Sequence, residues 1–330
     1  MESSRLAVDL PSEGRLPPFS GATGWLNSPP LTTDELRGKV VLVDFWTYTC
    51  INWLRTLSYV RAWAEKYEGQ GLVVVGVHTP EFPFERDADN VFEAAKDMRV
   101  EYPLALDSNY EVWRAFSNRY WPAVYIADAQ GKIRHHHFGE GGYQECERII
   151  QLLLREAGAG SVADDLVSDT GEGFEAQADW ANLKSPETYL GYEQAQNFAS
   201  PGDAGLDEPR TYALPDRLKL NHWALSGDWT IERGASVLNE ADGRLAFRFH
   251  ARDVHLVMGP HSRGTSVPFR VLVDGEPPGD AHGLDVDEQG RGTLVQQRLY
   301  QLIREPRSST DRTVEIRFLA PCEAYVFTFG

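Results

Sequence analysis

The stretch that decides the fold is Val43-Asp44-Phe45-Trp46-Thr47-Tyr48-Thr49-Cys50, which joins an apolar segment to an amphipathic one. Residues 39–46 are apolar and rich in β-branched side chains, which predicts a buried strand. From residue 51 to residue 68, apolar side chains recur every three or four positions, which predicts an amphipathic helix. We therefore expect Cys50 at the junction between a buried strand and a helix.

A thiol at the start of a helix lies near backbone N–H groups that have no partner within the helix. It also meets the positive end of the helix dipole, and both effects favour the thiolate. We therefore expect the pKa of Cys50 to lie below that of an ordinary cysteine, and Arg55 in the same helix would add positive potential. Without such surroundings, a lone cysteine is more often a small buried apolar residue.

The rest of the N-terminal half continues as alternating strands and helices. Hydrophobic runs and helical periodicity mark strands at 72–77, 123–127 and 133–138 and helices at 87–98, 110–116 and 144–155. This order of elements, with a hairpin before the last helix, is typical of an α/β domain with a mixed sheet. We assign this domain to residues 1–156.

The second half has a different composition and a different pattern. Residues 157–185 are acidic, rich in glycine, alanine and serine, and without a sustained period, which predicts a partly disordered linker. Residues 186–330 alternate short strands with turn signals such as Ser226-Gly227-Asp228 and Asp274-Gly275. The strands are expected at 244–250, 254–258, 269–273, 293–303, 314–319 and 325–329. This pattern predicts an all-β sandwich or jelly roll.

Length and charge restrict the class of protein. The 330 residues suggest two domains at about 150 residues each. A net charge of −17 argues against nucleic acid and anionic membranes as partners. No apolar run approaches the ~20 residues of a membrane helix, and the first 20 residues lack the apolar core of a secretory signal. With only three cysteines, the sequence predicts a cytoplasmic chain with no cofactor and no metal.

The segment before Cys50 resembles the active-site strand of the thioredoxin family, where Val-Asp-Phe-Trp leads into the first cysteine. Asp44 matches the family's buried aspartate, which helps to move protons during disulfide exchange. Trp121-Pro122 resembles the family's cis-proline, which lies beside the nucleophilic sulfur and presents backbone to the substrate. The resemblance therefore implies a thioredoxin fold, with Cys50, Asp44 and Pro122 in one site.

A wider resemblance extends over nearly the whole chain. It is carried by FWTYTCIN at 45–52, VGVHTPEF at 75–82, YWPA at 120–123, FGE at 138–140 and PETYLG at 186–191. These segments resemble the C-terminal extracytoplasmic part of DipZ-type thiol reductases, which pair a TlpA-like thioredoxin domain with a β-sandwich similar to a carbohydrate-binding module. The resemblance implies the same two-domain plan here, without the membrane-spanning electron-transfer part of that family.

One departure from that family changes the expected chemistry. The second cysteine of the Cys-x-x-Cys motif is replaced by Trp53, so no neighbouring thiol can resolve a mixed disulfide on Cys50. We expect thiol-based redox chemistry by Cys50 alone, either as peroxide reduction or as monothiol disulfide exchange, completed by an external thiol. The alternative is a non-catalytic binding protein on a degenerate thioredoxin scaffold. Cys146 is expected to have no redox role, and Cys322 to be structural.

Thr47-x-x-Cys50 also resembles the core of the peroxiredoxin motif Pro-x-x-x-Thr-x-x-Cys. In that family the threonine hydroxyl orients the peroxide and an arginine holds the thiolate. Val43 replaces the proline here, and Arg114 and Arg119 are the candidates for the arginine. The resemblance makes Thr47 a candidate site residue.

Other polar side chains in the first half have a simpler interpretation. His135-His136-His137 lies on a predicted strand, where neighbouring side chains point to opposite faces, so we expect a solvated strand rather than a zinc site. His78 ends a predicted strand, where it would either reach the active site or make a structural hydrogen bond. Glu81 and Glu85 are expected to be solvated loop charges.

The β-domain also contains residues that could bind a ligand. Trp223 and Trp229 would either stack on sugar rings or pack in the core, and the high average burial of tryptophan favours the core. Asp285 and Asp287 are too few to form a calcium site of 6–8 oxygen ligands.

Overall fold

The computed structural model describes residues 10–168, 171–306 and 310–330. The chain divides into two compact units, Met1–Glu175 and Ala176–Gly330, and each is described by itself. The first nine residues belong to the segment in which we find no secretory signal, and they lie outside the described residues. No helix in the described ranges is both long enough and apolar enough to cross a membrane.

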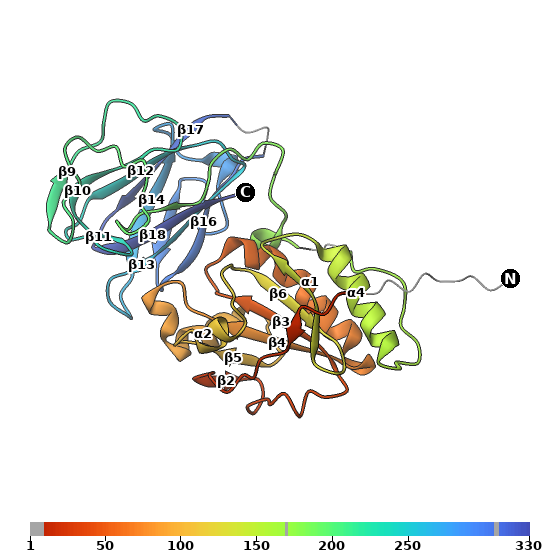
Figure 1. Ribbon diagram of the computed structural model, residues 1–330. Coiled ribbons are helices and arrows are strands. Elements are labelled where there is room, and N and C mark those ends of the chain that lie inside the picture. Colours follow the sequence, from red (N-terminus) through yellow and green to blue (C-terminus); the bar gives the residue numbers. More distant parts are fainter. Residues whose placement is uncertain (1–9, 169–170, 307–309) are drawn as a thin grey trace. The chain divides into compact units, whose positions relative to one another are not determined.

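The first unit is built on a seven-stranded mixed sheet in the order β1-β7-β6-β3-β4-β5-β2 (Figure 1). The central strands β3, β4 and β5 are parallel, whereas β6 and β7 run antiparallel to their neighbours. The strands are β1 (Gly14–Arg15), β2 (Gly24–Leu26), β3 (Val40–Trp46), β4 (Leu72–His78), β5 (Leu104–Leu106), β6 (Ala123–Ala127) and β7 (Lys132–Phe138). The helices are α1 (Ile51–Tyr67), α2 (Ala88–Asp97), α3 (Glu111–Ala115) and α4 (Tyr143–Glu156), with short 3₁₀ turns η1 (Glu68–Gln70), η2 (Pro83–Arg86) and η3 (Gly173–Glu175).

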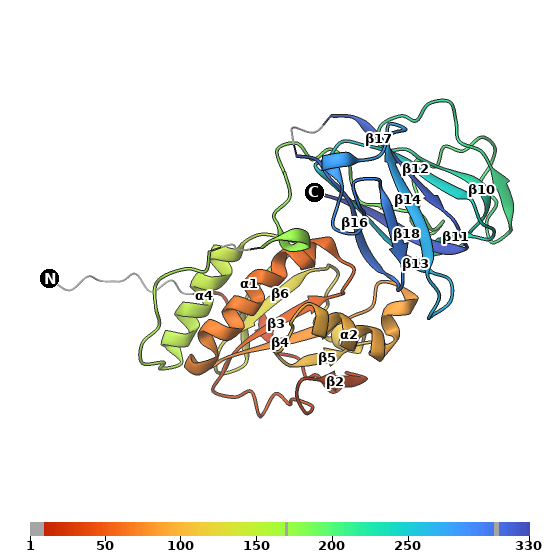
Figure 2. The ribbon, with the colours of Figure 1, turned by 180° about the vertical axis from the view of Figure 1, so that it is seen from behind.

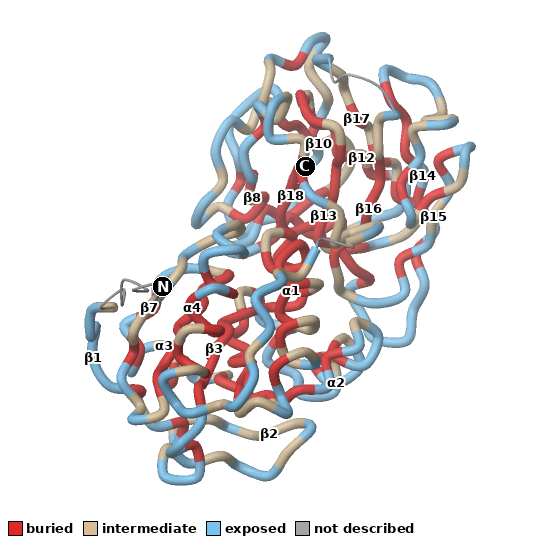
Figure 3. The backbone as a smooth tube through the Cα atoms, turned by 90° about the vertical axis from the view of Figure 1, so that its right-hand side faces the viewer, coloured by how far each residue is buried: buried red, intermediate tan, exposed pale blue. Residues whose placement is uncertain are grey.

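Alternation along β3 decides which side chains face the helices that carry the site. Every residue of β3 is buried, as the tube in Figure 3 shows. Val41, Val43 and Phe45 pack into the cluster that contains residues of α3. The remaining side chains, Asp44 among them, point to the opposite face, because successive side chains of a strand alternate. On that face α1 and α4 lie side by side (Figure 2), with the rings of Tyr59 and Tyr143 stacked 3.8 Å apart.

The expected elements of the first half are confirmed, with ends that differ by one or two residues. The predicted strand at 39–46 is β3, and the predicted helix at 51–68 is α1. The short strand β5 was not predicted, because three apolar residues give too little periodicity to recognise. The unit has the thioredoxin fold that the sequence implied.

The second unit is all-β, as predicted. Eleven strands form one curled sheet whose two halves are joined at β10 and enclose a common apolar core (Figure 1). Phe247 of one half lies 5.0 Å from Phe327 of the other, centroid to centroid. The strands are β8 (Thr188–Tyr189), β9 (Arg210–Tyr212), β10 (Trp223–Ile231), β11 (Ser236–Leu238), β12 (Gly243–Phe249), β13 (Asp253–Pro260), β14 (Val267–Val273), β15 (Arg291–Leu294), β16 (Arg298–Arg304), β17 (Arg312–Phe318) and β18 (Cys322–Phe329), with one 3₁₀ turn η4 (Gly279–Ala281).

The predicted turn at Ser226-Gly227-Asp228 is wrong, because these residues lie inside β10. The first part of β10 pairs with β12, and the part from Gly227 onward pairs with β9 and β11. Gly227 has φ +99°, a conformation that side chains rarely adopt, and it lets the strand pass from one half of the sheet to the other. The single strand predicted at 293–303 is likewise two strands, β15 and β16.

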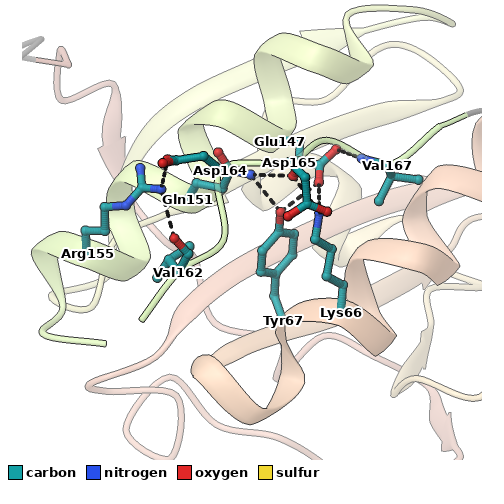
Figure 4. Close-up of polar contacts among 9 residues, drawn as sticks. All are labelled: Lys66, Tyr67, Glu147, Gln151, Arg155, Val162, Asp164, Asp165 and Val167. Atoms are coloured by element: carbon teal, nitrogen blue, oxygen red, sulfur yellow. Dashed lines mark hydrogen bonds and ion pairs between the residues drawn. The ribbon is translucent and has the colours of Figure 1, made fainter. Parts of the chain in front are cut away.

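The segment after α4 is held against the first unit (Figure 4). Glu147 of α4 is almost fully buried and accepts hydrogen bonds from the Lys66 ammonium at 3.1 Å and the Tyr67 hydroxyl at 2.7 Å. Its other oxygen accepts the backbone N–H of Val167 at 2.8 Å. Two helices that are distant in sequence thus supply partners for residues 162–167.

A second contact lies at the N-terminal part of residues 162–167, where the Arg155 guanidinium binds the Asp164 carboxylate at 2.5 Å (Figure 4). The composition predicted a partly disordered linker at 157–185, and the structure holds residues 162–167 of this stretch against the first unit. Polar composition indicates a segment without a core of its own, and it does not reveal partners supplied by α1 and α4. Residues 169–170 of this stretch lie outside the described residues.

Candidate functional site

Cys50 lies in the short connection between the buried strand β3 and the helix α1. It is the N-cap of the helix, with φ −76° and ψ 110°, and its side chain makes no capping hydrogen bond. Its backbone N–H donates to Thr47 O at 3.2 Å, and its carbonyl accepts the N–H of Leu54 at 3.0 Å. The thiol thus lies at the helix N-terminus, as expected, and the residue is 8% exposed.

Trp53, which replaces the second cysteine, forms a hydrogen bond with Asp44. The indole N–H donates to Asp44 Oδ2 at 2.8 Å, and both side chains are 0% exposed. The indole also stacks on Trp46, with ring centroids 4.3 Å apart. Trp53 therefore takes the place of the resolving cysteine and also donates a hydrogen bond to the aspartate.

Asp44 is a buried carboxyl with a perturbed protonation equilibrium. Burial raises the pKa of Asp44 to about 7, although the hydrogen bond from Trp53 lowers it. Its second oxygen, Oδ1, has no hydrogen-bond partner among the described residues. A carboxyl with this pKa can accept or release a proton near neutral pH.

The peptide bond between Trp121 and Pro122 is cis, as the sequence predicted. Pro122 directly precedes β6, whose first residue, Ala123, pairs with Phe45 near the end of β3. The Pro122 carbonyl accepts the N–H of Gly139 at 2.8 Å. The cis-proline and Cys50 therefore lie at the same edge of the sheet, because β6 begins where its antiparallel neighbour β3 ends.

Glu85 is not a solvated loop charge, contrary to the sequence-based expectation. It is 0% exposed, and its Oε1 accepts the Thr49 hydroxyl at 2.6 Å. Its Oε2 accepts the backbone N–H groups of Glu81 and Phe82 at 2.6 and 2.8 Å. Thr47 lies near the same carboxylate and is fully buried. The carboxylate therefore belongs to the surroundings of Cys50, and exposed loop composition gave no signal for it.

Two of the candidate arginines contact other groups of the fold. Arg55 is 2% exposed and forms an ion pair with Glu140 at 3.3 Å, so its charge is compensated locally. Arg114 is exposed and donates to the Asn109 carbonyl at 2.9 Å. Arg119 is exposed as well. The positive potential expected from Arg55 is thus shared with a buried carboxylate.

Cys146 lies in a different part of the unit. Its Sγ is 3.7 Å from His135 Nε2, and burial raises the pKa of the Cys146 thiol to about 12. His135 pairs with Ile126, and Ile126 pairs with Leu42. His135 therefore lies two strand spacings of ~4.8 Å away from Leu42 of β3. The end of β3, which precedes Cys50, lies a further ~13 Å along the strand. A disulfide requires Cα atoms within about 7 Å, so this arrangement keeps Cys146 away from Cys50.

The histidines serve packing and local contacts. His136 Nδ1 lies 2.7 Å from Glu13, and no group of three metal-binding side chains was found in the parts of the chain that the structure describes. His78 is buried between Trp46 and Tyr48, and burial lowers the pKa of His78 to about 3. It is therefore neutral and packed into the core beside the site.

The candidate ligand residues of the second unit are structural. Trp223 and Trp229 are fully buried, and their indole N–H groups donate to backbone carbonyls, so the core interpretation is confirmed. Asp285 binds Arg298 at 2.6 Å, and Asp287 accepts backbone N–H groups of its own turn. Cys322 is buried in β18.

Known proteins resemble both units of the chain. The AhpC/TSA family matches residues 15–136, and a family described as thioredoxin-like C-terminal domain matches residues 185–330. Protein DipZ of Mycobacterium tuberculosis is 36% identical over 328 residues, which is 98% of this chain and 44% of that protein. The chain therefore spans less than half the length of the DipZ proteins it matches.

A shorter relative covers the first unit alone. The thiol-disulfide oxidoreductase YkuV of Bacillus subtilis is 32% identical over 142 residues, which is 43% of this chain and 95% of that protein. A solution structure of a thioredoxin-like protein in the oxidised form is 30% identical and covers 43% of this chain and 96% of its own, with a TM-score of 0.40. The site geometry and the match to nearly all of YkuV lead to one assignment: the chain belongs to the family of thioredoxin-like thiol-disulfide oxidoreductases.

Proposed function

We propose that this chain performs thiol-disulfide exchange with Cys50 as its single reactive thiol. The observation that carries the proposal is the hydrogen bond from Trp53 to Asp44 at 2.8 Å. A tryptophan three residues after the cysteine cannot attack a mixed disulfide, yet it keeps the buried aspartate of a thiol-exchange site in contact with the helix that bears Cys50. The site thus retains the nucleophile and the proton-transfer group without the resolving thiol.

The exchange proceeds in two steps that balance without a further oxidant. The Cys50 thiolate attacks one sulfur of a disulfide R–S–S–R′, forms Cys50–S–S–R and releases R′S⁻, which takes up a proton. An external thiolate R″S⁻ then attacks the sulfur that carries R, which forms R–S–S–R″ and releases the Cys50 thiolate. Asp44, with a pKa of about 7, would accept a proton from Cys50 before the attack and return it afterwards.

Disulfide exchange accounts for the charge distribution better than peroxide reduction does. Peroxide reduction in the resembling family uses an arginine that holds the thiolate. Arg55 is paired with Glu140, and the exposed Arg114 is directed at Asn109. Thr47 keeps the sequence spacing of the family's threonine relative to Cys50, so peroxide is a substrate to be tested alongside disulfides.

The low exposure of Cys50 favours a second candidate, a non-catalytic binding protein on the same scaffold. With 8% of its surface exposed, Cys50 would have to be reached by a narrow substrate or after local opening. If the thiol is inert, Trp53 serves only to fill the core in place of a cysteine.

Mass spectrometry of Cys50 after exposure to oxidised glutathione, and separately to dilute peroxide, separates these possibilities. Exchange predicts a glutathione adduct on the peptide that contains Cys50, which persists until an external thiol is added. Trp53→Cys should lose the adduct without added thiol, because it restores a resolving sulfur within the same helix turn. A sulfenic acid without a glutathione adduct would favour peroxide reduction, and no modification under either condition would favour the binding protein.

An external thiol is the partner that this proposal requires. A reducing compartment such as the cytoplasm would provide it, and a low-molecular-weight thiol or a reduced protein thiol would serve equally in the second step.

A further inference from the structure

The buried carboxylate of Glu85 joins the segment before Cys50 to the loop that follows β4. Its Oε1 accepts the hydroxyl of Thr49, the residue directly before Cys50, at 2.6 Å. Its Oε2 accepts the backbone N–H groups of Glu81 and Phe82 at 2.6 and 2.8 Å. One side chain, contributed by η2, therefore holds two loops that are more than thirty positions apart in the sequence.

The same loop also holds the segment that contains the cis-proline. The indole N–H of Trp121, which precedes Pro122, donates to the Thr79 carbonyl at 3.1 Å. The hydroxyl of Tyr110 donates to the Pro80 carbonyl. Residues 79–82 thus link the thiol-bearing segment on one side with the cis-proline segment on the other.

The hydrogen bonds around Glu85 hold both of its carboxyl oxygens. Backbone N–H groups can only donate, so the oxygen that faces Glu81 and Phe82 must accept. Burial raises the pKa of Glu85 and outweighs the hydrogen bonds from Thr49 and from the backbone of Glu81 and Phe82, which lower it. A carboxylate that accepts several such bonds is strongly held in one geometry.

We propose that Glu85 is a positioning residue for Cys50: through Thr49 it fixes the thiol at the N-terminus of α1 and in register with the cis-proline loop. The role rests on the proposed function, because it matters only if Cys50 is a nucleophile. Glu85 does not touch the reacting sulfur, and it acts through Thr49 and the backbone of residues 79–82. A reactive sulfur displaced by about 1 Å can lose ~100-fold in rate, so a single fixed hydroxyl is enough to matter.

Other charged groups face the same region and must be considered when the reaction is followed against pH. Burial raises the pKa of Tyr48 and of Tyr110; Glu85 and Asp87 add to the shift of Tyr48, and Arg86 opposes the shift of Tyr110. The carboxylate of Glu85 is the fully buried member of this set. When it is ionised, this carboxylate opposes formation of a nearby thiolate, so positioning and charge have separate and measurable consequences.

Two substitutions distinguish the effect of the Thr49–Glu85 hydrogen bond from the effect of the Glu85 charge. Thr49→Val keeps the shape and the Glu85 charge but removes the donated hydrogen bond. Glu85→Gln removes the charge and can keep the link, because its amide oxygen can accept from the backbone while its NH₂ group donates to Thr49. Thr56→Val is the matched control, since the Thr56 hydroxyl donates to Asn52 O within α1 and contacts neither Glu85 nor its loop.

The measurement is the second-order rate constant for the reaction of Cys50 with a small aromatic disulfide, followed from acid to alkaline pH. We expect Thr49→Val to lower the alkaline plateau by roughly 10- to 100-fold, and Thr49→Ser to restore it. Glu85→Gln should leave the plateau within about twofold and move the midpoint to lower pH. Thr56→Val should match the wild type in both.

A reactive wild type whose plateau is unchanged in Thr49→Val would overturn the positioning role and leave the proposed function standing. A wild type that reacts no faster than Cys50→Ser would refute the proposed function and the positioning role together. If Thr49→Val does not fold, Thr49→Ala, which also lacks the hydroxyl, takes its place, and a plateau unchanged in Thr49→Ala overturns the positioning role.

Discussion

Replacing Trp53 by phenylalanine tests whether its indole N–H controls the protonation of Asp44. The indole donates to Asp44 at 2.8 Å, and its ring stacks on Trp46 with centroids 4.3 Å apart. Phenylalanine keeps an aromatic ring beside Trp46 but has no donor. Asp44 would then lose the hydrogen bond that lowers its pKa, and the pKa should rise further above 7.

The size of the effect follows from the two protonation states. Asp44 has a pKa of about 7 in the folded protein against an ordinary value of 3.8. The folded state therefore holds this proton more tightly, and stability falls as the pH rises from about 4 to about 7, by roughly 4 kcal/mol. A hydrogen bond contributes ~1.5–3 kcal/mol when one partner is charged and ~0.5–1.5 kcal/mol when both are neutral. Trp53→Phe should thus cost about 1–2 kcal/mol more when Asp44 is ionised than when it is protonated.

Urea unfolding followed by circular dichroism, at about pH 5 and about pH 9, measures this difference in the free energy of unfolding. Trp63→Phe is the matched control: Trp63 lies on the same helix, is buried, and its indole N–H has no hydrogen-bond partner among the described residues. Trp63→Phe should cost the same at both pH values, whereas Trp53→Phe should cost more at the higher pH. Equal losses at both pH values in Trp53→Phe would refute the reasoning.

Three further predictions concern other parts of the chain. Cys50→Ser should abolish exchange of glutathione disulfide, whereas Cys146→Ser should leave turnover with added thiol nearly unchanged; equal loss in both would show that Cys146 resolves Cys50. Glu147→Ala removes the acceptor that holds Val167, so proteolytic cleavage within residues 158–168 should become faster than in the wild type, and mapped cleavage sites with unchanged rates would contradict this. Gly227→Ala forces a side chain into φ +99° and against Gly243 Cα at 3.1 Å, and should lower the free energy of unfolding by about 1–2 kcal/mol or more; an unchanged urea midpoint would count against a strained position.

Local sequence patterns were sufficient for the fold of the first unit. The apolar run before Cys50 and the helical spacing after it predict β3 and α1 to within one residue at each end. These elements are long and strongly periodic, so their own residues specify them. Patterns failed where an element was short, as in β5, or where a turn-like tripeptide lies within a bent strand, as at Gly227.

The candidate site was also predictable in part: the sequence indicated its residues but not all of their contacts. The types and order of Asp44, Cys50 and Pro122 were readable because they follow one another in a recognisable strand-and-loop context. The sequence also showed that Trp53 removes the resolving thiol. It contained no sign that the indole would bond to Asp44, because that contact depends on which face of β3 meets which turn of α1.

What the sequence determined by itself was therefore the identity of the candidate nucleophile and the strand and helix that carry it, since both depend on neighbours along the chain. Only the tertiary structure decided that Glu85 is buried beside Thr49 and that Arg55 is paired with Glu140. It also decided that residues 162–167 lie bound to α1 and α4. The physical reason is the same in each case: a charged side chain in a loop looks solvated from its neighbours in sequence, and its burial depends on partners supplied by distant segments.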